Sequence, residues 1–181
     1  MDLSKIKLLD KEKWQDFTLT FDYIAHNYYE VEIKRTGDDF LVSFVKKSLS
    51  TPLEKNDENI DKLFKPCWDD VKAWGIIEDE KLIAVIETSV ESWSNRLRVT
   101  EIWIDKAYHR MRIGTALMDI AVKRAKDEGR RAIILETQSC NEVAINFYLS
   151  YGFTLIGFDS CCYQNDDVGR NEVRMEFGLF L

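Results

Sequence analysis

The sequence has few of the residues that make linkers or bind metals. It contains only 2 prolines, 8 glycines and 2 histidines in 181 residues. The scarcity of proline and glycine argues against long disordered linkers, and a chain of this length favours one domain with a sizeable core. With so few histidines and no Cys-x-x-Cys pair, a zinc site of Cys and His ligands is disfavoured, and we expect no metal.

Long hydrophobic runs are also missing. The start, MDLSKIKLLDKEKW, lacks the apolar core of a signal peptide, and no run of about eighteen apolar residues occurs. We therefore expect no membrane association and a cytoplasmic location. The 4 cysteines are expected to be buried free thiols: Cys67, Cys140, Cys161 and Cys162.

Basic side chains are outnumbered, with 25 Lys and Arg against 32 Asp and Glu, for a net charge of -7. Residues 1–90 hold 13 basic and 19 acidic side chains, for -6, and residues 91–181 hold 12 and 13, for -1. An acidic first half disfavours a nucleic-acid partner and favours a cationic one, although acidity can also serve solubility alone.

The first third of the chain is the hardest to assign. Lys11–Thr36 mixes aromatic and charged residues and fits a strand, a short helix or a binding loop. Thr51–Pro66 is polar and is expected to connect, with a helical turn near Lys62–Phe64. Between these stretches, the spacing of five apolar residues predicts a helix: Phe40, Leu41, Phe44, Val45 and Leu49.

From Trp74 onward the pattern is clearer. AWGIIED and KLIAVIETSVESW predict two strands around a tight turn at Glu78–Lys81, and RLRVTEIWID predicts a third. GTALMDIAVKRAKDEG predicts a helix that ends at Gly129. RAIILET, a continuous apolar run, predicts a strand covered on both faces.

The C-terminal quarter continues the alternation. NEVAINFYLSYG predicts a second helix, with Ser139 or Asn141 as its N-cap and Gly152 at its end. FTLIGFDSCCYQ and NEVRMEFGLFL predict two final strands joined by the turn NDDVG. The order of elements therefore predicts a mixed α/β sheet with a strand–helix–strand crossover in its middle.

The start of the first long helix has the features of an anion site. A helix that begins near Arg112 leaves backbone N–H groups unpaired, and these donors attract anions together with the helix dipole. Gly114 allows close approach to the backbone, Thr115 adds a hydroxyl, and Arg110 and Arg112 add positive charge. This junction predicts a pyrophosphate site, with a plain helix start and a solvated basic turn as the alternative.

Residues His109–Gly114, HRMRIG, resemble the Q/R-x-x-G-x-G/A motif of the GNAT superfamily of acetyl-CoA-dependent N-acetyltransferases. Gly114 matches the last position, while His109 stands at the first and Arg112 stands where the motif has its first glycine. A second block, ILETQSCNEVAINFYLSYGFTLIGFD, looks most like the streptothricin acetyltransferase branch. Its matching residues are Asn141, Ala144, Phe147, Tyr148, Gly152 and Phe153.

The resemblance covers Trp74 to the C-terminus and implies a GNAT-like mixed, mostly antiparallel sheet with splayed central strands flanked by helices. It implies a single acetyltransferase domain over residues 1–181, in which 1–73 shapes the acceptor site and 74–181 binds acetyl-CoA. The residues implied to contact acetyl-CoA are Ile104, Lys106, Arg112, Ile113, Gly114, Thr115, Ala116, Asn141, Asn146 and Tyr148.

Transfer of an acetyl group from a thioester to an amine needs a base for the ammonium and an acid for the leaving thiolate. We assign the acid to Tyr148, because a phenol, with an ordinary pKa of about 10, suits a thiol leaving group; Tyr151 is the reserve. Glu136 and Glu101 compete as the base, and either could act through a water, bind a substrate ammonium, or form a structural ion pair.

We therefore expect an acetyl-CoA-dependent N-acetyltransferase that acts on a primary amine of a small cationic molecule, with a streptothricin-type antibiotic as the sharpest case. A protein or peptide N-acetyltransferase and a non-catalytic acyl-CoA sensor stay open as alternatives. A nucleotide-binding module is disfavoured because the GxGxxG spacing is missing. Dimers are common in the family, so a homodimer is compatible with the resemblance.

Overall fold

The computed structural model describes residues 2–55 and 60–181. Over these residues the chain forms two compact units. Unit 1 is built from Met1–Phe21, Ile60–Leu135 and Leu179–Leu181, and unit 2 from Asp22–Asn59 and Glu136–Gly178, each taken over its described residues. The single acetyltransferase domain, in which residues 1–73 shape the acceptor site and residues 74–181 bind acetyl-CoA, stays a prediction.

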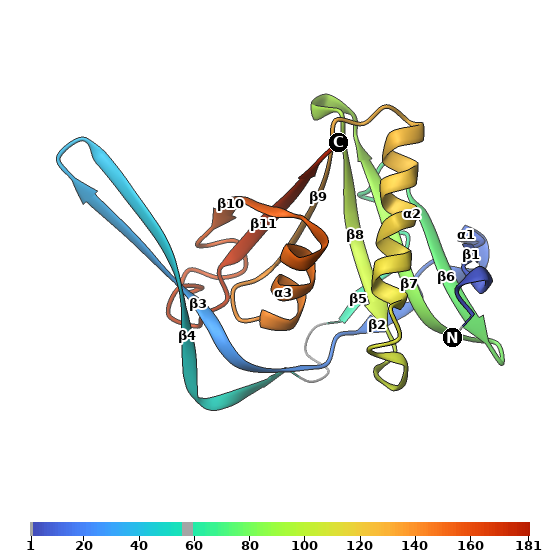
Figure 1. Ribbon diagram of the computed structural model, residues 1–181, viewed down its shortest axis with the longest axis horizontal. Coiled ribbons are helices and arrows are strands. Elements are labelled where there is room, and N and C mark those ends of the chain that lie inside the picture. Colours follow the sequence, from blue (N-terminus) through green and yellow to red (C-terminus); the bar gives the residue numbers. More distant parts are fainter. Residues whose placement is uncertain (1, 56–59) are drawn as a thin grey trace. The chain divides into compact units, whose positions relative to one another are not determined.

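Unit 1 is organised around a sheet with the strand order β1-β6-β7-β8-β9 (Figure 1). The neighbours are antiparallel except β8 and β9, which are parallel. The strands are β1 (Lys7–Leu8), β6 (Lys72–Glu78), β7 (Lys81–Glu91), β8 (Arg96–Ile104) and β9 (Ala132–Gln138), the last three residues of which belong to unit 2. The mixed, mostly antiparallel sheet predicted from the sequence is confirmed.

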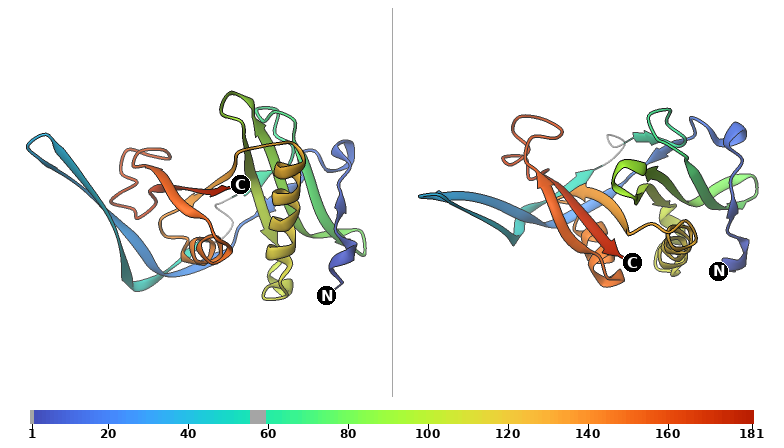
Figure 2. Two further views of the ribbon diagram at one scale, coloured as in Figure 1. Left: turned by 45° about the horizontal axis from the view of Figure 1, so that its top comes forward. Right: turned by 90° about the horizontal axis from the view of Figure 1, so that it is seen from above.

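Layers cover both faces of this sheet. Helix α2 (Ile113–Asp127) lies along one face of β6–β8 (Figure 2). A second apolar cluster includes Leu9, Trp14, Leu19 and Leu63 and packs against Val85 of β7. The smaller elements of unit 1 are η1 (Leu3–Lys5), α1 (Lys11–Trp14) and the pair β2 (Thr18–Thr20) and β5 (Ile60–Lys62). Because β7 is covered on both faces, its residues from Leu82 to Val90 are all buried.

The turns of unit 1 follow their sequence signals. Asp79 and Glu80, between β6 and β7, both have positive φ, as the tight turn that joins two hairpin strands requires. Asn95, after η2 (Ser92–Ser94), is left-handed and leads into β8. Gly129, beyond the end of α2, has a φ of 64°, so the predicted helix end is confirmed.

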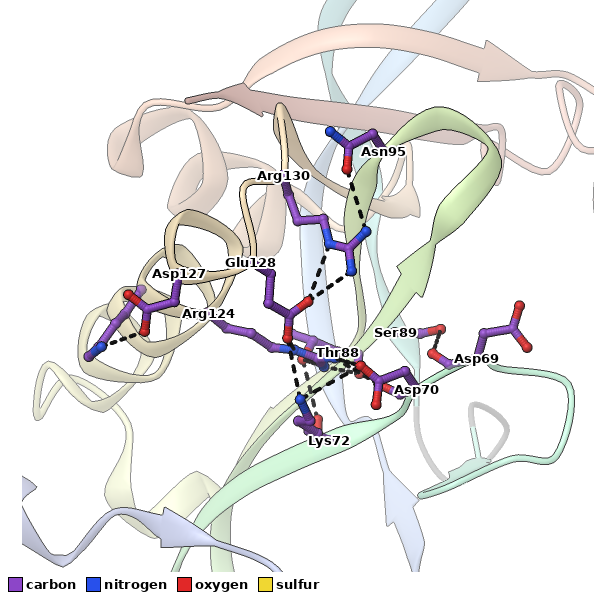
Figure 3. Close-up of polar contacts among 11 residues, drawn as sticks. Asp69, Asp70, Lys72, Thr88, Ser89, Asn95, Arg124, Asp127, Glu128 and Arg130 are labelled. Carbon is purple, nitrogen blue, oxygen red and sulfur yellow. Dashed lines mark hydrogen bonds and ion pairs between the residues drawn. The ribbon is translucent and has the colours of Figure 1, made fainter.

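Arg124 anchors α2 to the strands beneath it. Figure 3 shows its side chain reaching from the helix to Asp70, Thr88 and Glu128. Its guanidinium donates to the Thr88 hydroxyl at 2.9 Å and to the Asp70 carboxylate at 2.6 Å, although the residue is only 6% exposed. The orientation of α2 on the sheet is therefore stabilised by the buried guanidinium of Arg124 as well as by the apolar face of the helix.

Strands β8 and β9 pair over only a short length. The register joins Arg96, Leu97 and Arg98 to Ala132, Ile133 and Ile134. In the described chain, β8 continues to Ile104 with no further register partner in β9. The register of this parallel pair therefore ends at Arg98 and Ile134.

Unit 2 contains a long hairpin, a helix and a strand pair. The hairpin consists of β3 (Tyr23–Thr36) and β4 (Asp39–Lys55) (Figure 1). Helix α3 (Glu142–Tyr151) packs against β3, and β10 (Thr154–Asp159) pairs antiparallel with β11 (Arg174–Phe180). Asn141 is the N-cap of α3 and Gly152 its left-handed terminator, as predicted.

The helix predicted across Phe40–Leu49 is wrong, because these residues belong to β4. Positions four apart share one face in a helix and also in a strand, so the spacing of Phe40 and Phe44 fits both. The hairpin pairs Val31 with Phe44 and Ile33 with Val42, which makes one face apolar. Phe44 packs edge-on against Phe158 at 5.3 Å between ring centroids.

Other predictions have mixed outcomes. Of the cysteines, only Cys140 is buried; Cys67, Cys161 and Cys162 are exposed, because they lie in loops outside the core. Of the connecting stretch Thr51–Pro66, residues 56–59 lie outside the described residues, and Leu63 and Phe64 form a turn. None of the helices in the described chain combines the length and apolar character needed to cross a bilayer.

Candidate functional site

The loop before α2 takes a shape that usually needs glycine. From Asp105 the chain passes through η3 (Lys106–Tyr108) to a turn in which Arg110 and Arg112 have φ of 63° and 60°. Arg112 is the N-cap of α2 and occupies the position of the first motif glycine. The backbone therefore adopts the left-handed conformation with arginine in place, at a cost of about 1–2 kcal/mol.

The first turn of α2 is where the sequence predicts the contacts to a diphosphate. No side chain caps the helix at Arg112 and no acidic residue lies in the first turn. The Ala116 amide bonds to the Arg112 carbonyl at 3.2 Å, so it is already used within the helix. Arg112 and Thr115 are exposed beside the amides of Ile113 and Gly114. Unused N–H groups, a helix dipole and exposed positive charge suit a diphosphate.

The backbone at the end of β8 is partly engaged. The Ile104 carbonyl lies 2.9 Å from His109 Nε2, and the Lys106 carbonyl accepts from the His109 amide at 3.4 Å. His109 thus has a structural role in closing the loop. The edge of β8 beyond Arg98 has no register partner in the described part of β9. This edge suits an extended amide-bearing chain added as a strand, and the contacts assigned to Ile104 and Lys106 stay predictions.

Glu101 lies in a buried group of acidic side chains. It stands opposite Glu87 in the register of β7 and β8, and the two residues are 8% and 0% exposed. The Glu101 carboxyl is hydrogen-bonded to Asp61 of β5, which is ion-paired with Lys65. We call Asp61, Lys65, Glu87 and Glu101 the carboxyl cluster.

Burial dominates the electrostatics of this cluster. Loss of solvation, reinforced by Asp61 and Glu87, raises the pKa of Glu101 to about 9. Burial also raises the pKa of Glu87, although the Phe64 amide and the Thr100 hydroxyl donate to it at 2.6 and 2.8 Å. A carboxylate with a raised pKa is a strong enough base to take a proton from an ammonium.

Glu136, the other candidate base, has a different environment in unit 2. It lies on β9 and is ion-paired with Arg174 of β11. The Arg174 guanidinium engages this carboxylate in a structural ion pair. The geometry therefore favours Glu101 as the base, while both assignments stay predictions.

The residues at α3 that the resemblance implied to contact acetyl-CoA differ in their burial and in their contacts. The Asn141 side chain accepts from the Ala144 amide at 3.2 Å as a helix cap, and Asn146 is exposed. Tyr148 is 6% exposed and packs among Phe147, Phe153 and Phe177 at centroid distances of 5.6–6.1 Å. The roles of these residues, and of the half-buried Tyr151, stay predictions.

A depression of about 540 Å³ lies elsewhere on unit 1, at the β6–β7 turn and η3. Glu78, Asp79, Glu80 and Asp105 are among its lining residues. Four carboxylates would repel a diphosphate, so this depression does not fit the anion expected at α2. Nowhere in residues 2–55 and 60–181 do three or more His, Cys, Asp or Glu side chains gather as metal ligands would.

Three members of the carboxyl cluster were not identified from the sequence: Asp61, Lys65 and Glu87. Glu87 carried a usable signal, because it is the one charged residue inside the apolar run from Leu82 to Val90. Asp61 and Lys65 carried none, because they lie in a polar stretch. Their approach to β8 depends on the packing of β5, which sequence spacing does not reveal.

Residues 41–153 match the model of the acetyltransferase (GNAT) family. This match covers more than half of the chain. It includes α2, the carboxyl cluster and the whole of α3, and it ends at Phe153.

Individual proteins are similar along nearly the whole chain. The Escherichia coli streptothricin acetyltransferase is 22% identical over 176 residues, which are 97% of this chain and 95% of that protein. The crystal structure of nourseothricin acetyltransferase has a TM-score of 0.76 at 22% identity, covering 97% of this chain and 96% of its own. A candidate streptothricin acetyltransferase from Bacillus anthracis str. Ames, solved in complex with acetyl coenzyme A, has a TM-score of 0.70 at 22% identity, covering 97% and 98%.

Proposed function

We propose that the acceptor of this protein is a primary amine on a small cationic molecule. The chain belongs to the acetyltransferase (GNAT) family and uses acetyl-CoA as its co-substrate. A streptothricin-type antibiotic is the most specific form of this proposal. The similarity to streptothricin and nourseothricin acetyltransferases supports it.

The carboxyl cluster is the observation that carries the proposal. Three acidic side chains and one lysine form it, so its net charge favours a cation. An ammonium placed beside Glu101 favours the ionised carboxylate. A buried carboxyl group therefore suits an acceptor that arrives charged and must lose a proton before it reacts.

Each candidate residue then has a distinct task. The amides of Ile113 and Gly114, with Arg112 and Thr115 beside them, bind and orient the diphosphate of acetyl-CoA, which supplies the acetyl group as a thioester. Glu101 takes the proton of the acceptor ammonium. Tyr148 donates a proton to the departing thiolate.

A panel of amines tests the proposal. The protein is incubated with acetyl-CoA and streptothricin, an aminoglycoside, a polyamine or a short peptide, and the release of free thiol is followed. We expect release with streptothricin or another small cationic amine. Turnover with the peptide alone would identify a peptide acetyltransferase, and binding of acetyl-CoA without turnover of any amine would identify a sensor. Either result would overturn the proposal.

A further inference from the structure

The hairpin of unit 2 has an apolar face that the described chain covers only at one end. Val31 and Phe44 lie opposite each other on this face, and Phe44 packs against Phe158 of β10. The next pair on the same face is Ile33 and Val42, which are 50% and 37% exposed. The apolar face therefore continues from the covered part of the hairpin toward its tip (Figure 2), where its side chains are open to solvent.

We call residues 30–47 of this hairpin the arm. All residues from 32 to 42 are exposed, and Phe40 and Leu41 are 72% and 63% exposed. An exposed apolar surface of this kind marks an interaction site. The arm has as many acidic as basic side chains, so its net charge is zero in a chain of -7, and one arm does not repel another. These side chains are Glu30, Glu32, Asp38 and Asp39, and Lys34, Arg35, Lys46 and Lys47.

Strand β3 has an edge that is open to another strand. The sheet of β3 and β4 has no third strand among the residues that the structure describes. The Tyr29 amide points away from β4, because it donates to the Ser139 carbonyl at 3.0 Å. Backbone groups alternate in direction along a strand, and the pairing with β4 has no register shift from Tyr29 to the tip. The N–H and C=O groups on the open edge are therefore those of Val31, Ile33 and Arg35.

The sequence of this edge is complementary to itself in the antiparallel direction. When two copies of β3 pair about a two-fold axis at Ile33, Glu32 of each copy lies opposite Lys34 of the other. Val31 then lies opposite Arg35, so the open backbone groups of the two copies face each other. Charges on an edge strand often prevent pairing, but opposite charges in directly opposed positions favour it.

The charges on the two strands of the arm are engaged differently. Lys46 and Lys47 of β4 are ion-paired with Glu142 and Glu30, so they are already used inside unit 2. On β3, Glu32 and Lys34 pair only along the strand, at 2.7 Å, with side chains that are 46% and 62% exposed. Pairing of two β3 edges replaces this exposed contact with equivalent contacts between the copies. The edge of β3 is therefore better suited to a second copy than the edge of β4.

We propose that the arm is the interface of a homodimer, in which two β3 edges pair antiparallel about a two-fold axis at Ile33. The two hairpins then form one continuous sheet with the strand order β4-β3-β3-β4. The two-fold axis keeps both apolar faces on the same side of this sheet, with the two Ile33 side chains adjacent at its centre. The covered end of each arm lies beside the exposed end of the other. This assembly does not depend on which acceptor the protein acetylates.

Sedimentation equilibrium of the full chain provides the first test. We expect the wild type to reach twice the 21.2 kDa mass of one chain as its concentration rises. Glu32→Lys and Lys34→Glu should each weaken dimerisation by roughly ten-fold or more, because like charges then lie directly opposite each other. An equimolar mixture of these two variants should dimerise again, because each basic edge then meets an acidic one. Glu54→Lys, an exposed site on β4 outside the arm, is the control for net charge and should dimerise as the wild type does.

Cysteine cross-linking tests the register. The exposed Cys67, Cys161 and Cys162 are first replaced with Ser. In this background, Ile33→Cys places two thiols directly opposite each other, at a Cα separation of about 5.5 Å that a disulfide spans. Mild oxidation should therefore yield a covalent dimer on a non-reducing gel. Val42→Cys is the matched control, because Val42 is the cross-strand neighbour of Ile33 on the distal strand and should not cross-link.

The outcomes that overturn the proposal are specific. They are a monomer at every concentration up to the limit of solubility, or a dimer that neither charge variant weakens. Failure of the mixture to recover dimerisation would contradict the register, and cross-linking of Val42→Cys in place of Ile33→Cys would assign the interface to β4. Thermal unfolding and acetyl-CoA affinity of each variant establish that the fold is retained.

Discussion

Glu87 and Glu101 lie directly opposite each other on β7 and β8, and both are buried. Like charges in such cross-strand positions are destabilising. Glu87 is stabilised by two hydrogen bonds, from Phe64 and Thr100. Glu101 is hydrogen-bonded to another carboxyl group and has a pKa near 9. Glu87 therefore has a structural role, and Glu101 is the candidate for proton transfer.

Replacing Glu101 with Gln should lower kcat by about 100-fold or more, because loss of a general base costs this much. Wild-type kcat/KM should rise with pH up to about 9, where Glu101 ionises, whereas this limb should be absent in Glu101→Gln. Steady-state assays with acetyl-CoA across this range provide the measurement. Glu136→Gln is the matched comparison, and a larger loss in it than in Glu101→Gln would reverse the assignment.

The same substitution should stabilise the fold at alkaline pH. The pKa of Glu101 is raised from its ordinary 4.5 to about 9, so its contribution to stability is complete below pH 4.5 and is lost as pH rises to 9. Glu101→Gln removes this loss and should gain on the order of 2 kcal/mol at pH 8. Denaturant unfolding at pH 4 and pH 8 measures the difference. A gain that is equal at both pH values would contradict the ionisation argument.

Tyr148→Phe should lower kcat by roughly 10- to 100-fold through loss of the proton donor. The ring keeps its packing against Phe147, Phe153 and Phe177, so acetyl-CoA affinity and thermal stability should change little. Turnover assays combined with calorimetric titration of acetyl-CoA separate these effects. Tyr151→Phe, one helical turn away, serves as the control, and unchanged turnover in Tyr148→Phe would remove the role.

Arg112→Gly should be more stable than Arg112→Ala by about 1 kcal/mol. Both variants lose the same guanidinium, but only glycine takes the left-handed φ of 60° without strain. Both should raise the KM for acetyl-CoA several-fold through loss of charge beside the α2 amides. Thermal melts and KM values of the pair test this. Identical melting temperatures would show that the turn relaxes.

Glu128→Gln should weaken the fold at pH 7 by about 1 kcal/mol, but not at pH 2. Burial alone would raise the pKa of Glu128, yet hydrogen bonds from Arg124 and Arg130 (Figure 3) outweigh it and lower the pKa to about 2. Its contribution is therefore present above pH 4.5 and is lost as pH falls to 2. Asp127→Asn, in an exposed pair with Lys123, should have little effect at either pH. Thermal melts of both variants and of the wild type at pH 7 and pH 2 measure these differences in stability.

Local patterns predicted the elements from Trp74 to the C-terminus well. The strands around Asp79 and Glu80, the helix that ends before Gly129 and the cap at Asn141 all follow from residues adjacent in sequence. Turn residues and caps act within a few positions, so their effect can be identified without knowledge of the fold. The hairpin that contains Phe40 and Phe44 was missed because helix and strand share the spacing of four.

The sequence by itself determined the family motif, the helix start that can bind a diphosphate, and the acidic balance of the first half. These features depend on residue type and on separations of a few residues. Only the tertiary structure decided that Arg112 adopts the glycine conformation, that the register of β8 and β9 ends at Arg98, and that Asp61 meets Glu101 across 40 residues of chain. The basicity of Glu101 results from the burial of its carboxyl group, and burial depends on packing between segments distant in sequence.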